Sequence, residues 1–289
     1  MKTRNAEMIM AAIVIARSTS FIASKTALGN LAPLNLLGVR FLTAFVLLIL
    51  VNLKRIRQID SRSIRDGFII GALYTGCMVA EMYGLKFSES AKVAFLENTA
   101  IVFVPIVEIF LRRKLPDSLS GFCSFLAVVG VGFLTLKNGI SGLNIGDFFS
   151  LLAAAMYTAA IITTDRLSKD IKESSAILVG VIQVGTMGIF SMSLSLLFES
   201  PVFPQSGMEW ITVLWLAIVC TGFGFSLQPL AQKFISSERA STISALNPLG
   251  AGILGAVVFK EEMGVSSLIG ATLVMTGILL QSKQKDRTE

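Results

Sequence analysis

Ten segments of the chain are long and apolar enough to cross a bilayer, and several of them also contain charged residues. A helix of about 20 apolar residues spans the hydrocarbon core. Backbone polar groups in that core must be satisfied internally, so these segments predict an all-α, multi-pass membrane protein. The expected spans are 8–28, 33–53, 66–86, 91–111, 118–136, 146–166, 176–197, 210–233, 241–259 and 265–281.

The composition agrees with this class of protein and excludes others. Of the 289 residues, 53% are hydrophobic and 15% are charged, whereas soluble domains have about 25% charged residues. Ten spans leave only short loops, so we expect no sizeable soluble domain. The net charge of +6 is not gathered on a soluble face. The expected partners are therefore the lipid bilayer and a small-molecule substrate, and not nucleic acid.

The sequence lacks the residues that metal and redox chemistry usually need. It contains no histidine, the commonest metal ligand and proton shuttle. Cys77, Cys123 and Cys220 lie in or beside apolar spans, where they are expected to pack as small hydrophobic residues. Ser24 and Lys25 are adjacent, so they face different directions on a helix and do not form a catalytic pair. We therefore expect no metal, no cofactor and no enzymatic activity.

The distribution of Lys and Arg predicts the orientation. Eighteen of the 25 Lys and Arg residues lie at the two ends of the chain or in every second loop, and three lie within spans. The intervening loops hold four, Lys86, Lys92, Lys137 and Lys260. Because cytoplasmic loops are enriched in Lys and Arg, both termini are expected in the cytoplasm.

The two halves of the chain resemble each other. The segment GFCSFLAVVGVGFLTL (121–136) ends the first five spans, and GATLVMTGILLQ (270–281) ends the second five. Each follows a span with a proline and a short charged hinge. A repeated unit of five helices inverts its orientation in the membrane because five is odd. We therefore expect two inverted five-helix repeats, 1–140 and 141–289, unless the similarity is chance between apolar helices.

Four ionisable side chains lie in the outer part of the first four spans: Lys25, Arg40, Glu81 and Glu97, the last beside Asn98. A charge within a membrane helix costs about 2.5–3.5 kcal/mol, so such groups usually face the bundle interior and pair. They are candidates for a substrate site, with Glu81 or Glu97 as the proton acceptor. Alternatively, Lys25 and Glu81 reach the headgroups and Arg40 bonds a backbone carbonyl.

Two further features of the first half are candidates for the same site. Arg17 lies close to the middle of the first span, where neighbouring hydroxyl groups either bind a polar ligand with it or only satisfy its guanidinium. Tyr74, Met78 and Glu81 share one face of the third span. That face suits a cavity for a partly apolar solute, or it packs as an ordinary helix contact.

The polar residues of the second half are neutral and lie nearer the cytoplasmic side. Thr221, Gln228 and Gln232 share one face of the eighth span, and Gln183 and Asn247 lie in other spans. Under the proposed inversion this cluster corresponds to the charged cluster, and the two would bound a central cavity. Alternatively, the amides hold helices together, at about 0.6 kcal/mol each, which is the simpler interpretation for Gln183 and Gln232.

Pro105, Pro229 and Pro248 lie inside expected helices, where each removes one backbone hydrogen bond. They are expected to kink these helices and to act as pivots or to expose carbonyl oxygens to a cavity. For Pro248 the kink is expected near the start of the ninth span. Kinking without ligand contact is the simpler role for all three.

The order and spacing of several motifs resemble EamA-type members of the drug/metabolite transporter superfamily. In the first half these motifs are FIASKTAL (21–28), PLNLLGVRF (33–41) and AFLENTAIVFVPIVEIFLRRKLP (94–116), followed by 121–136. In the second half, TGFGFSLQPLAQKFISSERASTISALNPLGAGILGAVVFKEE (221–262) is similar to the eighth and ninth helices of that family. The matching positions are Lys25, Pro33, Arg40, Thr221, Gln228, Ala231, Gln232, Lys233, Arg239, Ala240, Pro248, Gly255 and Glu261.

The resemblance covers nearly the whole chain. It implies ten transmembrane helices in two inverted repeats, a location in the plasma (inner) membrane, and export of small metabolites coupled to protons or to exchange. The sequence departs from the family pattern at two places: Arg17-Ser18 replaces the usual Trp-Gly of the first helix, and Arg113 replaces the acidic residue that ends the fourth. With Lys25 and Arg40, Arg17 favours anionic or carboxylate-bearing solutes.

The sequence thus predicts a secondary active transporter, and specifically an exporter. The expected solute is a small polar or amphipathic metabolite, such as an amino acid or related carboxylate, moved by alternating access. Protons or a counter-substrate are the expected coupling partners, and the protein is a monomer or a homodimer. The alternative is a passive channel for small solutes, which would lack saturation and counterflow. A scaffold subunit would leave the charges on four helices without a role.

Overall fold

The computed structural model describes residues 3–57, 59–100, 144–244, 246–259 and 264–285, together with scattered positions from 103 to 133. The described residues form helices and turns, with no strand among them. The helices are α1 (Thr3–Ala27), α2 (Pro33–Val51), α3 (Leu53–Ile56), α4 (Ser61–Phe87), α5 (Ser90–Glu97), α8 (Ile145–Ser168), α9 (Glu173–Phe198), α10 (Gly207–Trp215), η2 (Leu216–Phe223), α11 (Gly224–Gln232), α12 (Ser237–Ser244), α13 (Asn247–Phe259) and α14 (Val265–Lys285).

Six helical stretches in the described part are long and apolar enough to cross a membrane. Five are single helices, α1, α2, α4, α8 and α9, and the sixth runs from α10 through the π-helical η2 to α11. The expected spans at these places agree with the helices to within a few residues. Most of the expected span 118–136, including Cys123, lies outside the described residues, and so does Pro105. Pro229 lies inside α11, as expected.

Two expected spans are broken helices and not continuous ones. The span expected at 91–111 stops at the end of α5, and a turn at Asn98 and Thr99 precedes the next helical residue. The span expected at 241–259 divides between the end of α12 at Ser244 and the start of α13 at Asn247. Pro248 therefore does not kink a helix. It occupies the first turn of α13, where its missing N–H needs no partner.

The two breaks occur at matching places in the two halves. Helices α5 and α12 are each eight residues long, and they begin 147 residues apart, at Ser90 and Ser237. Just before them, two Lys-Phe pairs adopt the same arrangement, Lys86 on Phe87 and Lys233 on Phe234. The distances from Nζ to the ring centre are 5.7 Å and 5.8 Å.

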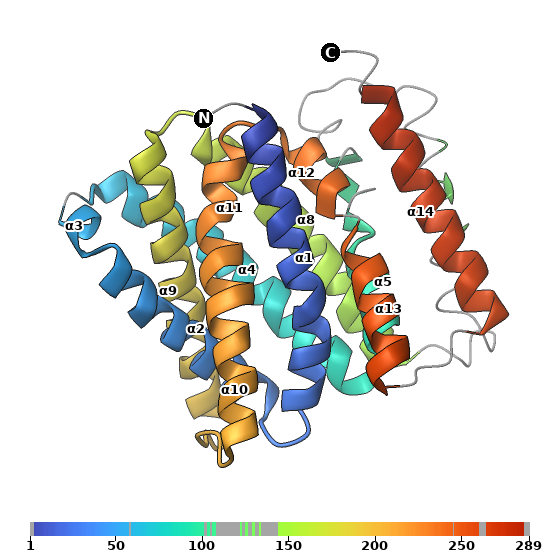
Figure 1. Ribbon diagram of the computed structural model, residues 1–289, viewed down its shortest axis with the longest axis horizontal. Coiled ribbons are helices and arrows are strands. Elements are labelled where there is room, and N and C mark those ends of the chain that lie inside the picture. The colour runs from blue at the N-terminus through green and yellow to red at the C-terminus, as the bar shows by residue number, and fades with distance from the viewer. Residues whose placement is uncertain are drawn as a thin grey trace.

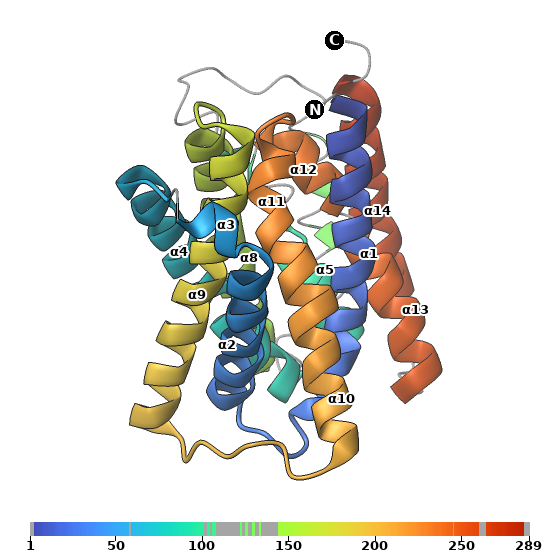
Figure 2. The same cartoon turned by 60° about the vertical axis from the view of Figure 1, so that its left-hand side comes forward.

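Helix packing shows the same correspondence. Helix α1 packs against α11 and α13, while α8 packs against α4 and α5. If α1 corresponds to α8, α4 to α10–η2–α11, and α5 to α12–α13, each of these contacts has an equivalent. The contact of α1 with α11 corresponds to that of α8 with α4, and the contact of α1 with α13 to that of α8 with α5. Helices α2 and α9 pack against each other, as do α5 and α13. The start of α1 and the end of α14 lie at the same end of the bundle (Figures 1 and 2). The boundary between residues 140 and 141 stays a prediction.

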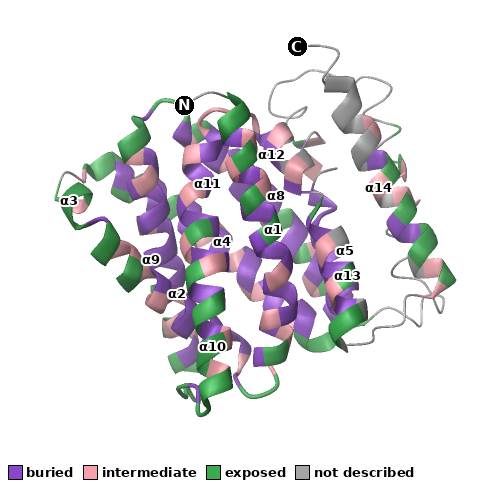
Figure 3. Cartoon of the chain, in the orientation of Figure 1, coloured by how far each residue is buried: buried purple, intermediate pink, exposed green. Residues whose placement is uncertain are grey.

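The surface and the interior differ as expected for a protein surrounded by lipid. Large apolar side chains, among them Ile189, Leu197 and Trp215, are exposed on the outside. The buried faces of the helices meet in the interior (Figure 3). Ionisable side chains, including Arg17, Arg40, Glu81 and Glu97, are buried there as well. These four ionisable groups therefore face the bundle and not the hydrocarbon.

Several helices in the described part begin with a side-chain cap, among them α4 and α8. Asp60 precedes α4 and accepts hydrogen bonds from the hydroxyl and the backbone N–H of Ser63, which hold the pKa of Asp60 below its usual value. Asn144 and Asp147 form a reciprocal capping box at the start of α8. Such caps satisfy backbone N–H groups that lack partners within the helix.

Close approach of α9 and α11 depends on Gly180, because a Cβ there would overlap the backbone of Ser226. We expect Gly180→Ala to lower the free energy of unfolding by about 1–3 kcal/mol, since the helices must move apart. The melting temperature of the purified protein in detergent measures this loss. Gly207→Ala is the matched control, because a Cβ at Gly207 meets no atom within 4 Å. Equal melting temperatures for the two variants would contradict the prediction.

Candidate functional site

Arg17 lies in the middle of α1, and its side chain is only 7% exposed. Its Nη2 lies 3.5 Å from Oε1 of Glu97 on α5. Its Cζ lies 5.1 Å from the ring centre of Tyr157 on α8 and 5.0 Å from that of Phe225 on α11. A carboxylate and two aromatic faces thus take the place of water around this cation.

A pair of carboxyl groups lies beside Arg17. Glu97 is the last residue of α5 and Glu81 lies in the last two turns of α4, and both are buried. The two carboxyl groups are close enough to interact electrostatically, and Sγ of Cys77 lies 4.0 Å from Oε1 of Glu97. Two neighbouring carboxyl groups disfavour ionisation of both, because like charges repel. The pair is therefore a candidate for holding a proton.

Arg40 on α2 is the second buried cation, with 1% of the residue exposed. Its Nε donates to Oγ1 of Thr221 at 2.7 Å. Thr221 lies in η2, and π-helical turns often occur at functional sites. Among the described residues, Nη1 of Arg40 has no hydrogen-bond partner. A buried guanidinium donor without a partner is costly, so this position favours a bound anionic group or acceptor.

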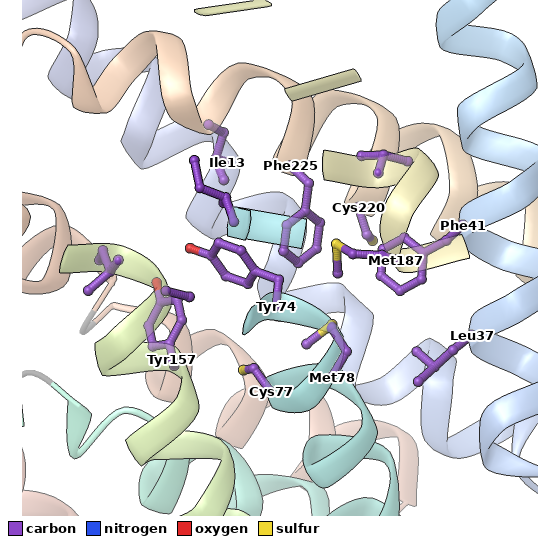
Figure 4. Packing of buried hydrophobic residues seen from close by; sticks show 14 of the residues in the cluster. Ile13, Leu37, Phe41, Tyr74, Cys77, Met78, Tyr157, Met187, Cys220 and Phe225 are labelled. Atoms are coloured by element: carbon purple, nitrogen blue, oxygen red, sulfur yellow. The ribbon is translucent and has the colours of Figure 1, made fainter. Parts of the chain in front are cut away.

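Aromatic rings join the cation sites to each other. The ring centre of Phe225 lies 5.2 Å from that of Tyr74 and 5.7 Å from that of Phe41, both in edge-on contacts. Tyr74 also approaches Tyr157, at 6.1 Å between ring centres. In Figure 4 the ring of Tyr74 lies between Phe225 and Tyr157. These rings come from α2, α4, α8 and α11, so residues of both halves form one wall.

A chain of amide hydrogen bonds continues from Tyr74. Nε2 of Gln228 donates to the Tyr74 hydroxyl at 2.5 Å and to Oε1 of Gln232 at 3.1 Å. Nε2 of Gln232 donates to the carbonyl of Ile161 at 3.0 Å, which joins α11 to α8. In the described part of the chain, Oε1 of Gln228 and both amide atoms of the buried Gln183 lack partners. Gln232 therefore holds two helices together, whereas Oε1 of Gln228 remains available as an acceptor within the described part of the chain.

The two asparagines at the helix breaks have different partners. Oδ1 of Asn247 accepts a hydrogen bond from the Ser18 hydroxyl at 3.0 Å, and this bond joins α1 to the start of α13. Nδ2 of Asn98 donates to the carbonyl of Ala94 at 2.8 Å and so closes the end of its own helix. Asn247 therefore holds two helices together, whereas Asn98 stabilises the break itself.

Lys25 differs from the other predicted cations. Its side chain is partly exposed near the end of α1, and Nζ donates to the carbonyl of Ser88 at 3.1 Å. It therefore lies at the loop between α4 and α5. The other predicted residues that meet in the interior are Arg17, Arg40, Tyr74, Glu81, Glu97, Thr221 and Gln228.

Tyr157 and Phe225 contact Arg17 but were not expected at the site. Tyr157 lies in a span whose middle contains no ionisable group, so charge did not single it out. One signal was present, because a tyrosine buried in an apolar helix needs a partner for its hydroxyl. That partner is Oγ of Ser244, at 3.0 Å. Phe225 carried no such signal, since an apolar ring in an apolar helix is ordinary.

Comparison with known proteins identifies the family. The EamA-like transporter family matches residues 5–136 and 144–282. The chain belongs to this family. Proteins of the family have ten helices, which agrees with the fold class expected from the sequence. The chain is therefore a multi-pass membrane protein of a transporter family.

The relatives are mostly transporters without an assigned solute. An uncharacterized transporter of Archaeoglobus fulgidus is 25% identical over 285 residues, covering 96% of this chain and 85% of its own. The uncharacterized transporter YetK of Bacillus subtilis is 23% identical over 300 residues, covering 99% and 90%. The GDP-mannose transporter GONST1 of Arabidopsis thaliana is 23% identical over 259 residues, covering 83% and 75%. A solved crystal structure shares the fold, with a TM-score of 0.71, 17% identity and 100% of both chains covered.

Removing Arg17 should leave a buried negative charge without a counterion. We expect Arg17→Met to lower the free energy of unfolding by about 3–5 kcal/mol, as breaking one side of a buried ion pair usually does. The double variant Arg17→Met with Glu97→Gln should recover much of this loss, because the cation and the carboxylate that it contacts are then removed together. Denaturation in mixed micelles measures both. A double variant no more stable than Arg17→Met would show that the two residues do not act as a pair.

Proposed function

We propose that this EamA-like protein is a secondary carrier that exports a small polar or amphipathic metabolite, such as an amino acid or related carboxylate, by alternating access. The observation that carries this proposal is the buried cluster of Arg17, Arg40, Glu81 and Glu97. Four helices contribute these groups to the interior of a membrane bundle. Ionisable groups within membrane spans are costly and mark pathways for solutes and ions.

The charge balance of the cluster favours an anionic group on the solute. Two guanidinium groups lie beside two neighbouring carboxyl groups, and when one of these carboxyl groups holds a proton, one positive charge is uncompensated. Nη1 of Arg40 and Oε1 of Gln228, which have no partner among the described residues, offer a donor and an acceptor. The rings of Tyr74 and Phe225 suit an apolar part of the solute. GONST1 and a second Arabidopsis relative, GONST2, are GDP-mannose transporters, and GDP-mannose is also anionic.

Burial of the whole cluster supports a carrier over a pore. Arg17, Arg40, Glu81 and Glu97 are all closed off from the surface. A pore keeps a continuous path open, whereas a carrier passes through a state in which its site is closed at both ends. The proposed location is the plasma (inner) membrane with both termini cytoplasmic, which the distribution of Lys and Arg supports.

The test of the carrier starts from metabolite profiling of the medium of cells with and without the protein. The most strongly exported metabolite is then used for counterflow in proteoliposomes. We expect saturable counterflow in the unaltered protein, and a rise in KM of about tenfold or more in Arg40→Gln, because a charge-assisted hydrogen bond is lost. The exposed Lys86→Gln is the control and should transport normally. Flux without saturation or counterflow would show a channel instead.

The burial of two interacting carboxyl groups, Glu81 and Glu97, supports proton coupling through this pair. We expect Glu81→Gln and Glu97→Gln to abolish accumulation driven by a pH gradient while counterflow of the same metabolite continues. A neutral amide binds no proton at the pH values of the gradient, but it keeps the size of the carboxyl side chain and can still form hydrogen bonds. Uptake into proteoliposomes with and without the gradient separates the two activities. Gradient-driven uptake retained by both variants would exclude this pair as the acceptor.

A further inference from the structure

Two of the ion pairs that lie outside the central site involve the short segment of a broken helix. Nζ of Lys92, the third residue of α5, lies 2.7 Å and 2.8 Å from the two carboxylate oxygens of Asp147 on α8. Nε of Arg239, the third residue of α12, lies 2.5 Å from Oε1 of Glu7 on α1. Each pair therefore joins the short helix of one half to the first helix of the other half.

The two pairs occupy equivalent places. Helices α5 and α12 have the same length, and their first residues are 147 positions apart in the sequence. Lys92 and Arg239 are also 147 positions apart, so they are matching positions in the two helices. Asp147 lies in the first turn of α8, and Glu7 lies in the second turn of α1. Inverted repeats place equivalent features at opposite ends of a membrane protein.

The pairs lie at opposite ends of the bundle. Glu7 and Lys25 are separated along α1 by about 27 Å, at a rise of about 1.5 Å per residue. Lys25 contacts the carbonyl of Ser88, two residues before the start of α5. The Lys92–Asp147 pair is therefore near the far end of α1 from the Arg239–Glu7 pair. Figure 2 shows α12 beside the start of α1.

Each short helix also reaches the central site with its other end. Helix α5 ends at Glu97, which contacts Arg17. Helix α12 ends at Ser244, whose hydroxyl bonds Tyr157, and the ring of Tyr157 contacts the same guanidinium. A movement of either short helix therefore changes the surroundings of Arg17. The two ion pairs and the site are connected through α5 and α12, and also through α1 and α8, which contain Glu7 with Arg17 and Asp147 with Tyr157.

From this arrangement we propose that Lys92–Asp147 and Arg239–Glu7 are two gates that open alternately, one on each side of the membrane. The inference rests on the carrier proposed above. Both pairs are formed here, in a state where the central cluster is buried. Side-chain exposures are 16% and 2% for Lys92 and Asp147, and 29% and 27% for Arg239 and Glu7. Water reaches at least one side of each pair, so each opens at a modest cost.

The surroundings of Asp147 are compatible with the release of Lys92. Asp147 stays anchored when Lys92 leaves, because its carboxylate also accepts the backbone N–H of Asn144 at 3.2 Å. The start of α8 therefore remains capped while α5 moves. Alternatively, both pairs are static anchors that only hold the helices together. Gates and anchors differ in one measurable respect: weakening a gate at one end favours closure at the other.

Distances between spin labels at the two ends test the proposal in lipid nanodiscs, with the native cysteines replaced by alanine. One label pair, Glu89→Cys with Ile145→Cys, reports on the Lys92–Asp147 end. The other, Arg4→Cys with Ser236→Cys, reports on the opposite end. Glu89, Ile145 and Arg4 are exposed, and Ser236 is partly exposed. Pulsed electron–electron double resonance measures the distances between the labels, and this measurement needs no solute.

The variants are Lys92→Gln and Arg239→Gln, with Lys92→Arg and Arg239→Lys as charge-preserving controls. We expect Lys92→Gln to raise the ratio of long to short 89–145 distances about three- to tenfold, while the 4–236 distance stays short. Arg239→Gln should do the reverse. The controls should keep the distribution of the unaltered protein. Glu7→Gln removes the second pair from its other side and should match Arg239→Gln, which guards against a folding defect in one variant.

Two results would overturn the gates. Either the distance distributions do not change in the Gln variants, or each variant lengthens the distances at both ends together, as static anchors would. The outcome is separate from that of the proposed function. Absence of counterflow in the unaltered protein rejects the carrier even if the distances shift in opposite directions. Counterflow together with unchanged distances rejects only the gates.

Discussion

The contact between Arg17 and Glu97 is the interaction on which the rest of the interior depends. It places a full positive charge and a carboxyl group in the interior, where the two side chains are 7% and 1% exposed. Neither group is stable there alone, so the surrounding structure has to supply partners for both. The rings of Tyr157 and Phe225 cover the guanidinium, and Glu81 lies close to Glu97. Residues from α1, α4, α5, α8 and α11 are thereby fixed around one charge.

The broken helices follow from the same requirement. A continuous helix through Glu97 would satisfy its last carbonyl groups internally and would carry its side chains past the centre of the bundle. Ending α5 at Glu97 instead presents the carboxyl group at a helix end, with Asn98 closing the turn. On the other side, α12 ends at Ser244 and α13 begins with Asn247, which bonds Ser18. The two breaks thus meet α1 and α8 from opposite sides.

A closed site with unpaired polar atoms is what a transport protein needs between its two open states. Among the described residues, Nη1 of Arg40 and Oε1 of Gln228 have no hydrogen-bond partner, although both are buried. A protein selected only for stability would pair or remove such groups, because burying a polar atom without a partner lowers the stability. Membership of the EamA-like transporter family agrees with this interpretation. The proposed gates give the same short helices a second role at the membrane surfaces.

Much of the fold followed from the sequence alone, because lipid restricts the choice of structure. Apolar segments of sufficient length have to be helices, and those at α1, α2, α4, α8 and α9 were predicted to within a few residues. The spacing of motifs such as PLNLLGVRF indicated the family before any comparison. Charges within spans pointed to Arg17, Arg40, Glu81 and Glu97, since no other residues there are so costly to bury.

The tertiary structure decided which of these groups meet. Lys25 has the same charge as Arg17, but it lies at a helix end and reaches a loop carbonyl instead. Tyr157 and Phe225 carry no charge, and only the packing of α8 and α11 against α1 makes them neighbours of Arg17. The helix breaks at Asn98 and before Asn247 were also hidden, because apolar sequence allows a continuous helix. Hydropathy indicates how well each segment fits into lipid. Which side chains meet depends on which face of each helix turns inwards, and contacts between segments distant in the sequence determine that orientation.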